Sequence, residues 1–193
     1  MKIRLLSPVL ACIMCAALIF IQTGCGPSRD RLAKVAGYGQ QLSALLEANH
    51  TLPASLLHEG VIDQATHNRL VSGFERSRVL IDRFNVGLRD VLAQERPNPA
   101  SLVPLVAEMI EQTRALNLLP HNKTYQRALA GIEVSLRAIA NYFALQRADA
   151  RRAGYTDEQI AAAVGCERRV LALIVAYAYQ PNTVPDRYGR DRS

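Results

Sequence analysis

Apolar residues recur along the chain with the spacing of helices rather than strands. Two long segments, 63–95 and 122–153, each place an apolar or small residue every three or four positions, close to a 3.5-residue repeat. The two stripes are Leu70, Phe74, Ser77, Ile81, Phe84, Leu88 and Val91, and Tyr125, Leu129, Ile132, Leu136, Ile139 and Phe143. They predict two long helices, the first capped by Asp63 and roughly 50 Å long at 1.5 Å per residue.

Shorter segments show the same spacing. We expect a helix from Asp30 to about Asn49, a short turn of helix over 54–58, and a further helix over 100–116. Prolines lie at the breaks between these segments, as is typical of helix boundaries. No run alternates polar and apolar residues, so no sheet is predicted.

These helices predict an all-α, four-helix-bundle-like single domain. Two long helices of matched length and period should lie antiparallel, with the two shorter ones filling the opposite side. Gly73 and Gly87 weaken the first long helix unless they allow close packing.

The C-terminal part predicts a helical corner. Thr156 and Gln159 form a capping box for a brief helix that ends at Gly165. Segment 170–179 is apolar on every side and too short to span a membrane, so we expect it to insert into the bundle.

By pattern, this corner resembles the helix-turn-helix of bacterial regulators over about 20 residues. The matching positions are Ile160, Ala161, Val164, Gly165, Cys166, Leu171 and Ile174. A DNA reader needs polar side chains along the outward face of its second helix, and only Glu167, Arg168 and Arg169 at its start qualify. We therefore interpret the segment as a tight corner packed on the bundle and predict no nucleic-acid partner.

The N-terminus predicts export. Lys2 and Arg4 precede an apolar run, 5–21, and then Gln22-Thr23-Gly24-Cys25, which is the order of a secretory signal. Cys25 after Thr23-Gly24 resembles the processing site of a bacterial lipoprotein, although Gln22 stands where that site usually has Leu. The resemblance covers residues 1–25 and implies that Cys25 is lipidated and becomes the new N-terminus.

Two alternatives to this processing stay open. The 17 residues of 5–21 reach the lower limit of the ~17–25 that span a bilayer, so an uncleaved anchor is one of them. An ordinary cleaved signal is another, without an A-x-A-like site near Gly24. Cys12 is a weaker candidate for lipidation than Cys25, because the apolar region before it is shorter than in a normal signal. The anchor and both kinds of signal place the domain outside the cytoplasm, and Gly26 in place of Asp favours the outer membrane of a double-membraned bacterium.

The chain thus divides into four parts. We predict a signal peptide over 1–24, a tether over 25–29, the helical domain over 30–179 and a disordered tail over 180–193.

Charge and cysteine content change this picture little. The net charge of +6 falls to about +4 once Lys2 and Arg4 leave with the signal. Lipidation of Cys25 and loss of the signal would leave Cys166, which we expect to be buried and unpaired.

Five arginines are candidates for one anion-binding patch. They lie near the C-terminus of the second long helix and at the start of the last helix: Arg147, Arg151, Arg152, Arg168 and Arg169. A lipid phosphate or an acidic partner would suit them. The alternative is that the first three stabilise a helix C-terminus, at about 0.3–1 kcal/mol each.

No residue pattern predicts catalysis, a metal or a cofactor. One Glu-x-x-His motif occurs, Glu47 to His50, without the second copy that a di-iron bundle requires, and no G-x-S-x-G sequence is present. We therefore expect a non-enzymatic envelope lipoprotein that binds or scaffolds an envelope protein through a helical face. The alternative is a bundle that holds a small apolar ligand between its long helices, against Phe74, Phe84, Leu136 and Phe143. A metal-binding or DNA-binding helical protein is less favoured.

Overall fold

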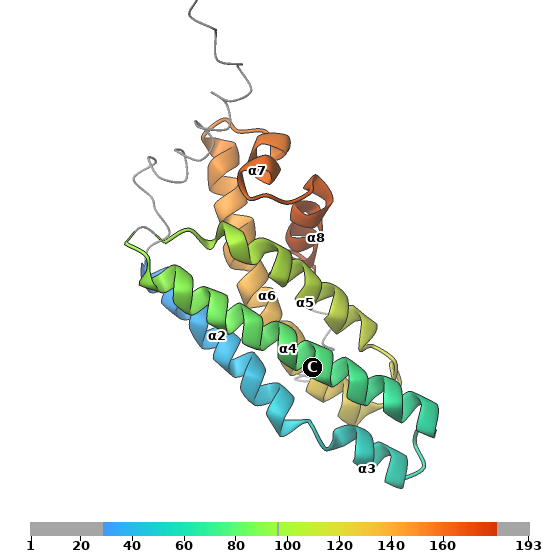
Figure 1. Cartoon of the computed structure of the whole chain (residues 1–193). Helices are drawn as coiled ribbons and strands as arrows, with labels where there is room; N and C mark the ends of the chain where they lie inside the picture. The colour runs from blue at the N-terminus through green and yellow to red at the C-terminus, as the bar shows by residue number, and fades with distance from the viewer. Residues whose placement is uncertain (1–28, 96, 181–193) are drawn as a thin grey trace, which may run out of the picture.

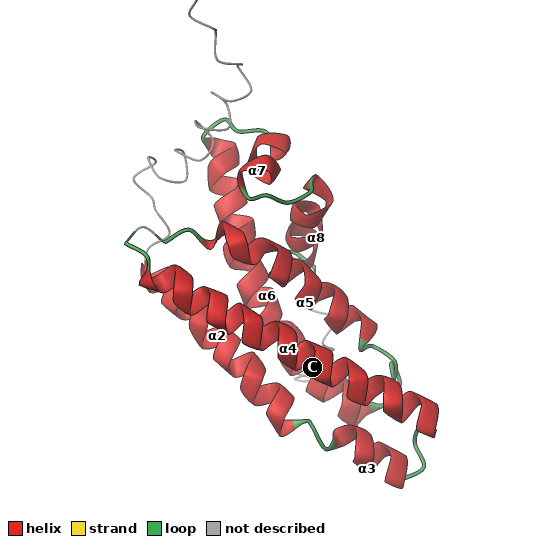
Figure 2. Cartoon of the chain, viewed as in Figure 1, coloured by secondary structure: helices red, strands yellow, loops and turns green. Residues whose placement is uncertain are grey.

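The computed structural model describes residues 29–95 and 97–180, and every regular element in these residues is a helix (Figures 1 and 2). The all-α prediction is therefore confirmed. The predicted signal peptide, Cys25 and almost all of the predicted tail lie outside the described residues. In chain order the elements are α2 (Arg29–Ala48), α3 (Leu52–His58), α4 (Gln64–Ala93), η1 (Pro99–Leu102), α5 (Val103–Ala115), α6 (Lys123–Arg152), α7 (Asp157–Ala163) and α8 (Arg168–Ala178).

The helix starts follow from local capping. The Asp63 carboxylate accepts a hydrogen bond from the Thr66 N–H at 2.7 Å, and the Asn122 side chain accepts one from the Tyr125 N–H at 2.8 Å. The predicted capping box is also present. The Gln159 N–H donates to the Thr156 hydroxyl at 3.3 Å, and the Thr156 N–H donates to the Gln159 side chain at 2.8 Å.

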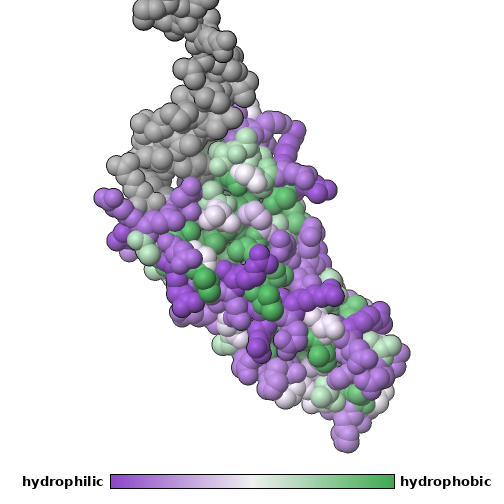
Figure 3. Space-filling model, in the orientation of Figure 1, coloured by the Kyte–Doolittle hydropathy of each residue, from purple (hydrophilic) through white to green (hydrophobic). Residues whose placement is uncertain are grey.

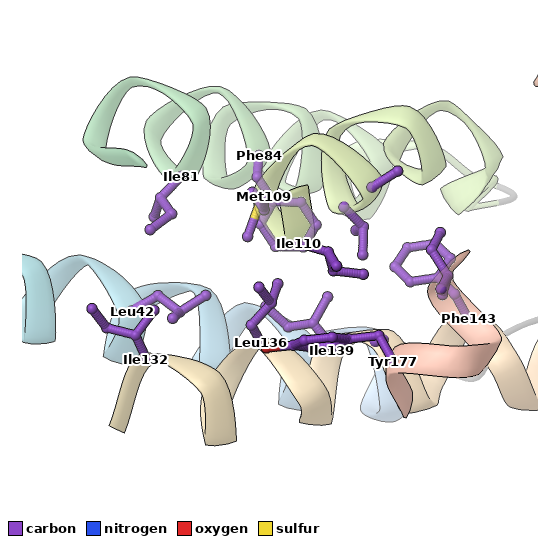
Figure 4. Close-up of a cluster of buried hydrophobic side chains, with 14 of the residues drawn as sticks. Leu42, Ile81, Phe84, Met109, Ile110, Ile132, Leu136, Ile139, Phe143 and Tyr177 are labelled. Carbon is purple, nitrogen blue, oxygen red and sulfur yellow. The ribbon is translucent and has the colours of Figure 1, made fainter. Parts of the chain in front are cut away.

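The four longer helices α2, α4, α5 and α6 surround one core. All residues of the two predicted stripes on α4 and α6 are buried. Leu42 of α2, Ile81 of α4, Ile110 of α5 and Leu136 of α6 point into the same space (Figure 4). Burial of each such side chain contributes roughly 1.5–3 kcal/mol to stability, so this shared core holds the domain together.

The sequence pattern predicts that the two longest helices, α4 and α6, pack along each other. In the structure they do not. α2 packs against both α4 and α6, and α5 does the same from its own side, so α4 and α6 lie diagonally across the core. The prediction of a direct α4–α6 pair is wrong because small residues let α2 and α5 approach α4 closely. A Cβ atom on Gly73, for example, would lie 2.6 Å from Cδ2 of Leu116.

The last helix lies on the surface of this core. α8 packs on α5 and α6 through Leu171, Ile174 and Tyr177, which are buried. Ala172 and Ala176, on the other side of the helix, are exposed. The prediction that segment 170–179 inserts into the bundle is therefore correct for one side of α8 and wrong for the other side, which is exposed. Its apolar outer face remains uncovered by the described residues.

Candidate functional site

The N-terminal end of α2 lies at the same end of the domain as the helical corner. The Arg29 guanidinium donates a hydrogen bond to the Gln94 carbonyl at 3.2 Å, so the start of α2 meets the end of α4. Pro99 and Ala100 of η1 follow shortly after Gln94, and both line a groove with residues of α6, α7 and α8. We call this end, formed by the start of α2, the end of α4, η1, the end of α6 and the α7–α8 corner, the tether end (Figure 1).

Two of the five predicted arginines pair with one carboxylate at this end. Arg147 donates two hydrogen bonds to Asp157, through Nε at 2.9 Å and Nη2 at 2.7 Å. The Arg151 guanidinium lies 3.9 Å from the same carboxylate. The hydrogen bond from Arg147 is the largest cause that lowers the pKa of Asp157, and the charges of Arg151 and Arg168 add to it. Asp157 is thus held ionised at neutral pH.

The remaining pairs are exposed. Arg168 reaches Glu158 at 2.7 Å, Arg169 reaches Glu167 at 2.8 Å, and Arg152 reaches Asp149 at 2.7 Å. Exposed pairs of this kind contribute only about 0–1 kcal/mol each, so water or another anion competes for them easily. Five guanidiniums therefore face four carboxylates at this end, and the predicted patch is nearly balanced in charge.

An apolar groove adjoins the Arg147–Asp157 pair. It encloses a cavity of about 30 Å³ and is open to solvent on one side. Gln146 and Arg147 are the polar residues of its wall, and the other lining residues are apolar: Pro99, Ala100, Val103, Phe143, Ile160, Val164, Leu171, Ile174 and Val175. Figure 3 shows apolar residues gathered over this end, with hydrophilic residues around them. At this volume the groove offers a shallow apolar surface rather than a pocket for a ligand.

The predicted cavity between the long helices is much smaller. Leu136 and Ile81 line a space of about 10 Å³, which is about enough for one water molecule. Phe74, Phe84 and Phe143 are packed in the core and are not part of its wall. This space gives no support to an apolar ligand held between α4 and α6.

A buried aromatic site was not predicted from the sequence. The guanidinium carbons of Arg114 and Arg137 lie 5.9 and 5.8 Å from the centre of the Tyr177 ring. The Tyr177 hydroxyl is buried and finds no hydrogen-bond partner among the described residues. Burial is the main cause that raises the pKa of Tyr177, and the nearby Glu133 carboxylate adds to it. No local spacing could reveal this site, because Arg114 and Tyr177 are on different helices far apart in the chain.

The other candidates occupy ordinary structural positions. The His50 ring bonds the backbone carbonyl of Glu47 at 2.6 Å, so it caps the end of its own helix. Within the described ranges, no group of three or more His, Cys, Asp or Glu side chains is placed to hold a metal ion. Cys166 lies in the turn between α7 and α8, half-buried and unpaired, and burial raises the pKa of its thiol.

The corner also lacks the surface of a DNA reader. Past Arg168 and Arg169, the exposed residues of α8 are Ala172 and Ala176, which cannot bond to base edges. One helix in the described part of the chain, α6, is long and apolar enough to cross a membrane by length and composition. Half of its most apolar window is buried in the protein, as in a core helix.

Comparisons with known proteins identify no relative. No protein-family model, curated protein or solved structure matches this chain.

Proposed function

We propose that this protein is a non-enzymatic cell-envelope lipoprotein that acts as a membrane-tethered helical binding or scaffold module. The N-terminal segment carries the proposal. Lys2 and Arg4, the apolar run over 5–21, and Cys25 after Thr23-Gly24 follow the order of a lipoprotein signal. A lipid on Cys25 would hold the domain at the membrane, with the outer membrane favoured by Gly26.

We propose further that the described domain belongs to the four-helix-bundle class, with its long helices antiparallel. The shared core of α2, α4, α5 and α6 supports this class. A rigid domain on a short tether suits a protein that presents a surface to a partner. The proposed partners are the membrane, through the lipid, and an envelope protein.

Replacement of the lipidated cysteine tests the proposal. Cys25→Ala should abolish incorporation of labelled fatty acid and release the domain from the membrane fraction. Cys12→Ala is the matched control, because that residue would leave with the signal, and it should keep both properties. The measurement is acyl labelling and membrane fractionation of the full chain.

Two results would contradict lipidation at Cys25. Unchanged membrane association of Cys25→Ala, with no acyl label in the wild type, would indicate an uncleaved anchor over 5–21. Loss of acyl label in Cys12→Ala alone would show that the lipid is on Cys12 and that the tether is longer.

A further inference from the structure

The point where the lipid tether would enter the domain lies beside the helical corner. The hydrogen bond from Arg29 to the Gln94 carbonyl places the start of α2 next to the end of α4. The chain then reaches Pro99 and Ala100, which line the groove with Ile160 of α7. The end of the molecule from which the tether leaves is therefore the end that carries the groove.

The tether is too short to let the domain move far from the membrane. Cys25 lies four residues before Arg29, and an extended chain spans at most about 3.6 Å per residue, or about 14 Å here. This step rests on the proposed lipidation of Cys25. If it holds, the tether end faces the bilayer, and α3 at the opposite end faces away from it.

The surface at the tether end has the composition of a membrane-contacting face. On the outer side of α8, Ala172, Ala176 and Tyr179 are exposed, while Leu173 and Val175 are half-buried. Val175 also lines the apolar groove, so the two surfaces are continuous. Nothing polar interrupts this side of α8 between Arg169 and Tyr179.

Arginines lie at the end of this apolar surface that is nearest to the corner. Arg152, Arg168 and Arg169 are each engaged in an exposed ion pair that costs little to open. A guanidinium binds a phosphate through two parallel hydrogen bonds, so these side chains suit lipid phosphates better than lysines would. The apolar face therefore suits the acyl-chain region of a bilayer, and the arginines suit its headgroup phosphates.

We propose that the α7–α8 corner is a membrane-docking surface that lies against a phospholipid bilayer. The outer face of α8 and the mouth of the groove meet the boundary between headgroups and acyl chains. Arg168 and Arg169, at the N-terminal end of α8, and Arg152 meet the phosphates. The lipid on Cys25 and the corner then jointly hold the domain at the membrane, as two weak membrane signals commonly do.

Cys166 offers a direct test, because it lies in the corner and would be the free thiol of the lipidated protein. An environment-sensitive dye is attached to it in the full, acylated protein, at mildly alkaline pH because the pKa of this thiol is raised. The protein is then reconstituted into vesicles of phosphatidylethanolamine and phosphatidylglycerol. The matched control carries the dye on Val61→Cys in a Cys166→Ser background, since Val61 is exposed at the opposite end.

Docking predicts that phospholipids with a doxyl group quench the dye on Cys166, and that iodide in the water does not. The dye on the Val61→Cys control should behave in the opposite way. The double variant Ala172→Asp with Ala176→Asp should lose the quenching by doxyl lipid, because carboxylates oppose insertion. Val79→Asp, on the exposed side of α4, should keep it.

Several results would overturn the docking surface. Iodide quenching of the dye on Cys166 equal to that on Val61→Cys would show that the corner faces water. Protection from iodide without quenching by doxyl lipid would show that a second copy or another protein covers it. These results bear on docking alone if fatty acid is incorporated at Cys25, whereas loss of that incorporation in the wild type would instead disprove the proposed lipoprotein.

Discussion

Asn85 of α4 fills the space next to Gly39 of α2, where a Cβ atom at position 39 would collide with the side-chain amide oxygen of Asn85. The Asn85 amide donates hydrogen bonds to the Ser43 hydroxyl at 3.0 Å and to the Gly39 carbonyl at 3.4 Å. Gly39 is buried for this reason, although it stands in the middle of a helix. The close approach fixes how α2 and α4 pack.

We expect Gly39→Ala to destabilise the domain. The new methyl group would displace the Asn85 amide and break its hydrogen bonds, each worth about 1 kcal/mol. Alanine favours a helix over glycine by about 1 kcal/mol, which offsets part of the loss and leaves about 1 kcal/mol of destabilisation. Urea unfolding followed by circular dichroism measures the change. Gly37→Ala is the control, because nothing lies within 4 Å of its added atom, and it should stabilise the domain. Equal effects at both positions would contradict this account.

The Arg147–Asp157 pair predicts a pH-dependent stability. Asp157→Asn should cost about 1–2 kcal/mol at neutral pH, since it removes a hydrogen-bonded charge pair that is mostly shielded from water. Because the pKa of Asp157 is lowered from its ordinary value of 3.8, this contribution is present above that value. It is lost as the pH falls below 3.8 and through the lower pKa of the folded state. The difference between wild type and variant should therefore shrink in acid.

Thermal unfolding of wild type and Asp157→Asn between pH 7 and pH 3 checks this. Glu167→Gln serves as the control, because its pair with Arg169 is exposed and should change stability little at any pH. A constant difference down to pH 3 would mean that Asp157 acts through packing rather than charge.

The helices themselves could be predicted because their causes are local. A stripe such as that from Leu70 to Val91, and caps such as Asp63 and Asn122, depend on residues a few positions apart. Which helices touch could not be predicted. The contacts that decide it, Gly39 with Asn85 and Gly73 with Leu116, join residues about 40 positions apart.

The candidate site could likewise be predicted from the sequence only in part. The arginines of the corner stand out in the sequence, but their carboxylate partners do not. Asp157 meets Arg147 only because the chain reverses at Gly154, where φ is 94°, a conformation that favours glycine. The periodicity of Val170 to Tyr179 showed an apolar helix, yet it could not show that one side stays uncovered.

Two buried tyrosines should respond in opposite ways to loss of their hydroxyl groups. The Tyr125 hydroxyl donates a hydrogen bond to the Leu116 carbonyl, so Tyr125→Phe should destabilise the domain by about 1–2 kcal/mol. The Tyr177 hydroxyl is buried without a partner among the described residues, so Tyr177→Phe should be neutral or stabilising. The ring contacts with Arg114 and Arg137 would persist. Urea midpoints of the two variants measure this, and a destabilising Tyr177→Phe would reveal a partner for its hydroxyl.

Burial of Tyr125 also predicts a loss of stability in alkali. Burial raises the pKa of Tyr125 from 10.0 to about 12, so the folded state holds a proton that the unfolded chain releases at lower pH. Its contribution is complete below pH 10 and disappears as the pH rises from 10 towards 12. The same direction holds for Tyr142 and Tyr177. Unfolding midpoints between pH 8 and pH 11 should therefore fall less steeply in Tyr125→Phe than in wild type, whereas Tyr179→Phe, at an exposed position, should follow the wild type. Parallel curves for all three proteins would show that Tyr125 ionises freely in the folded state.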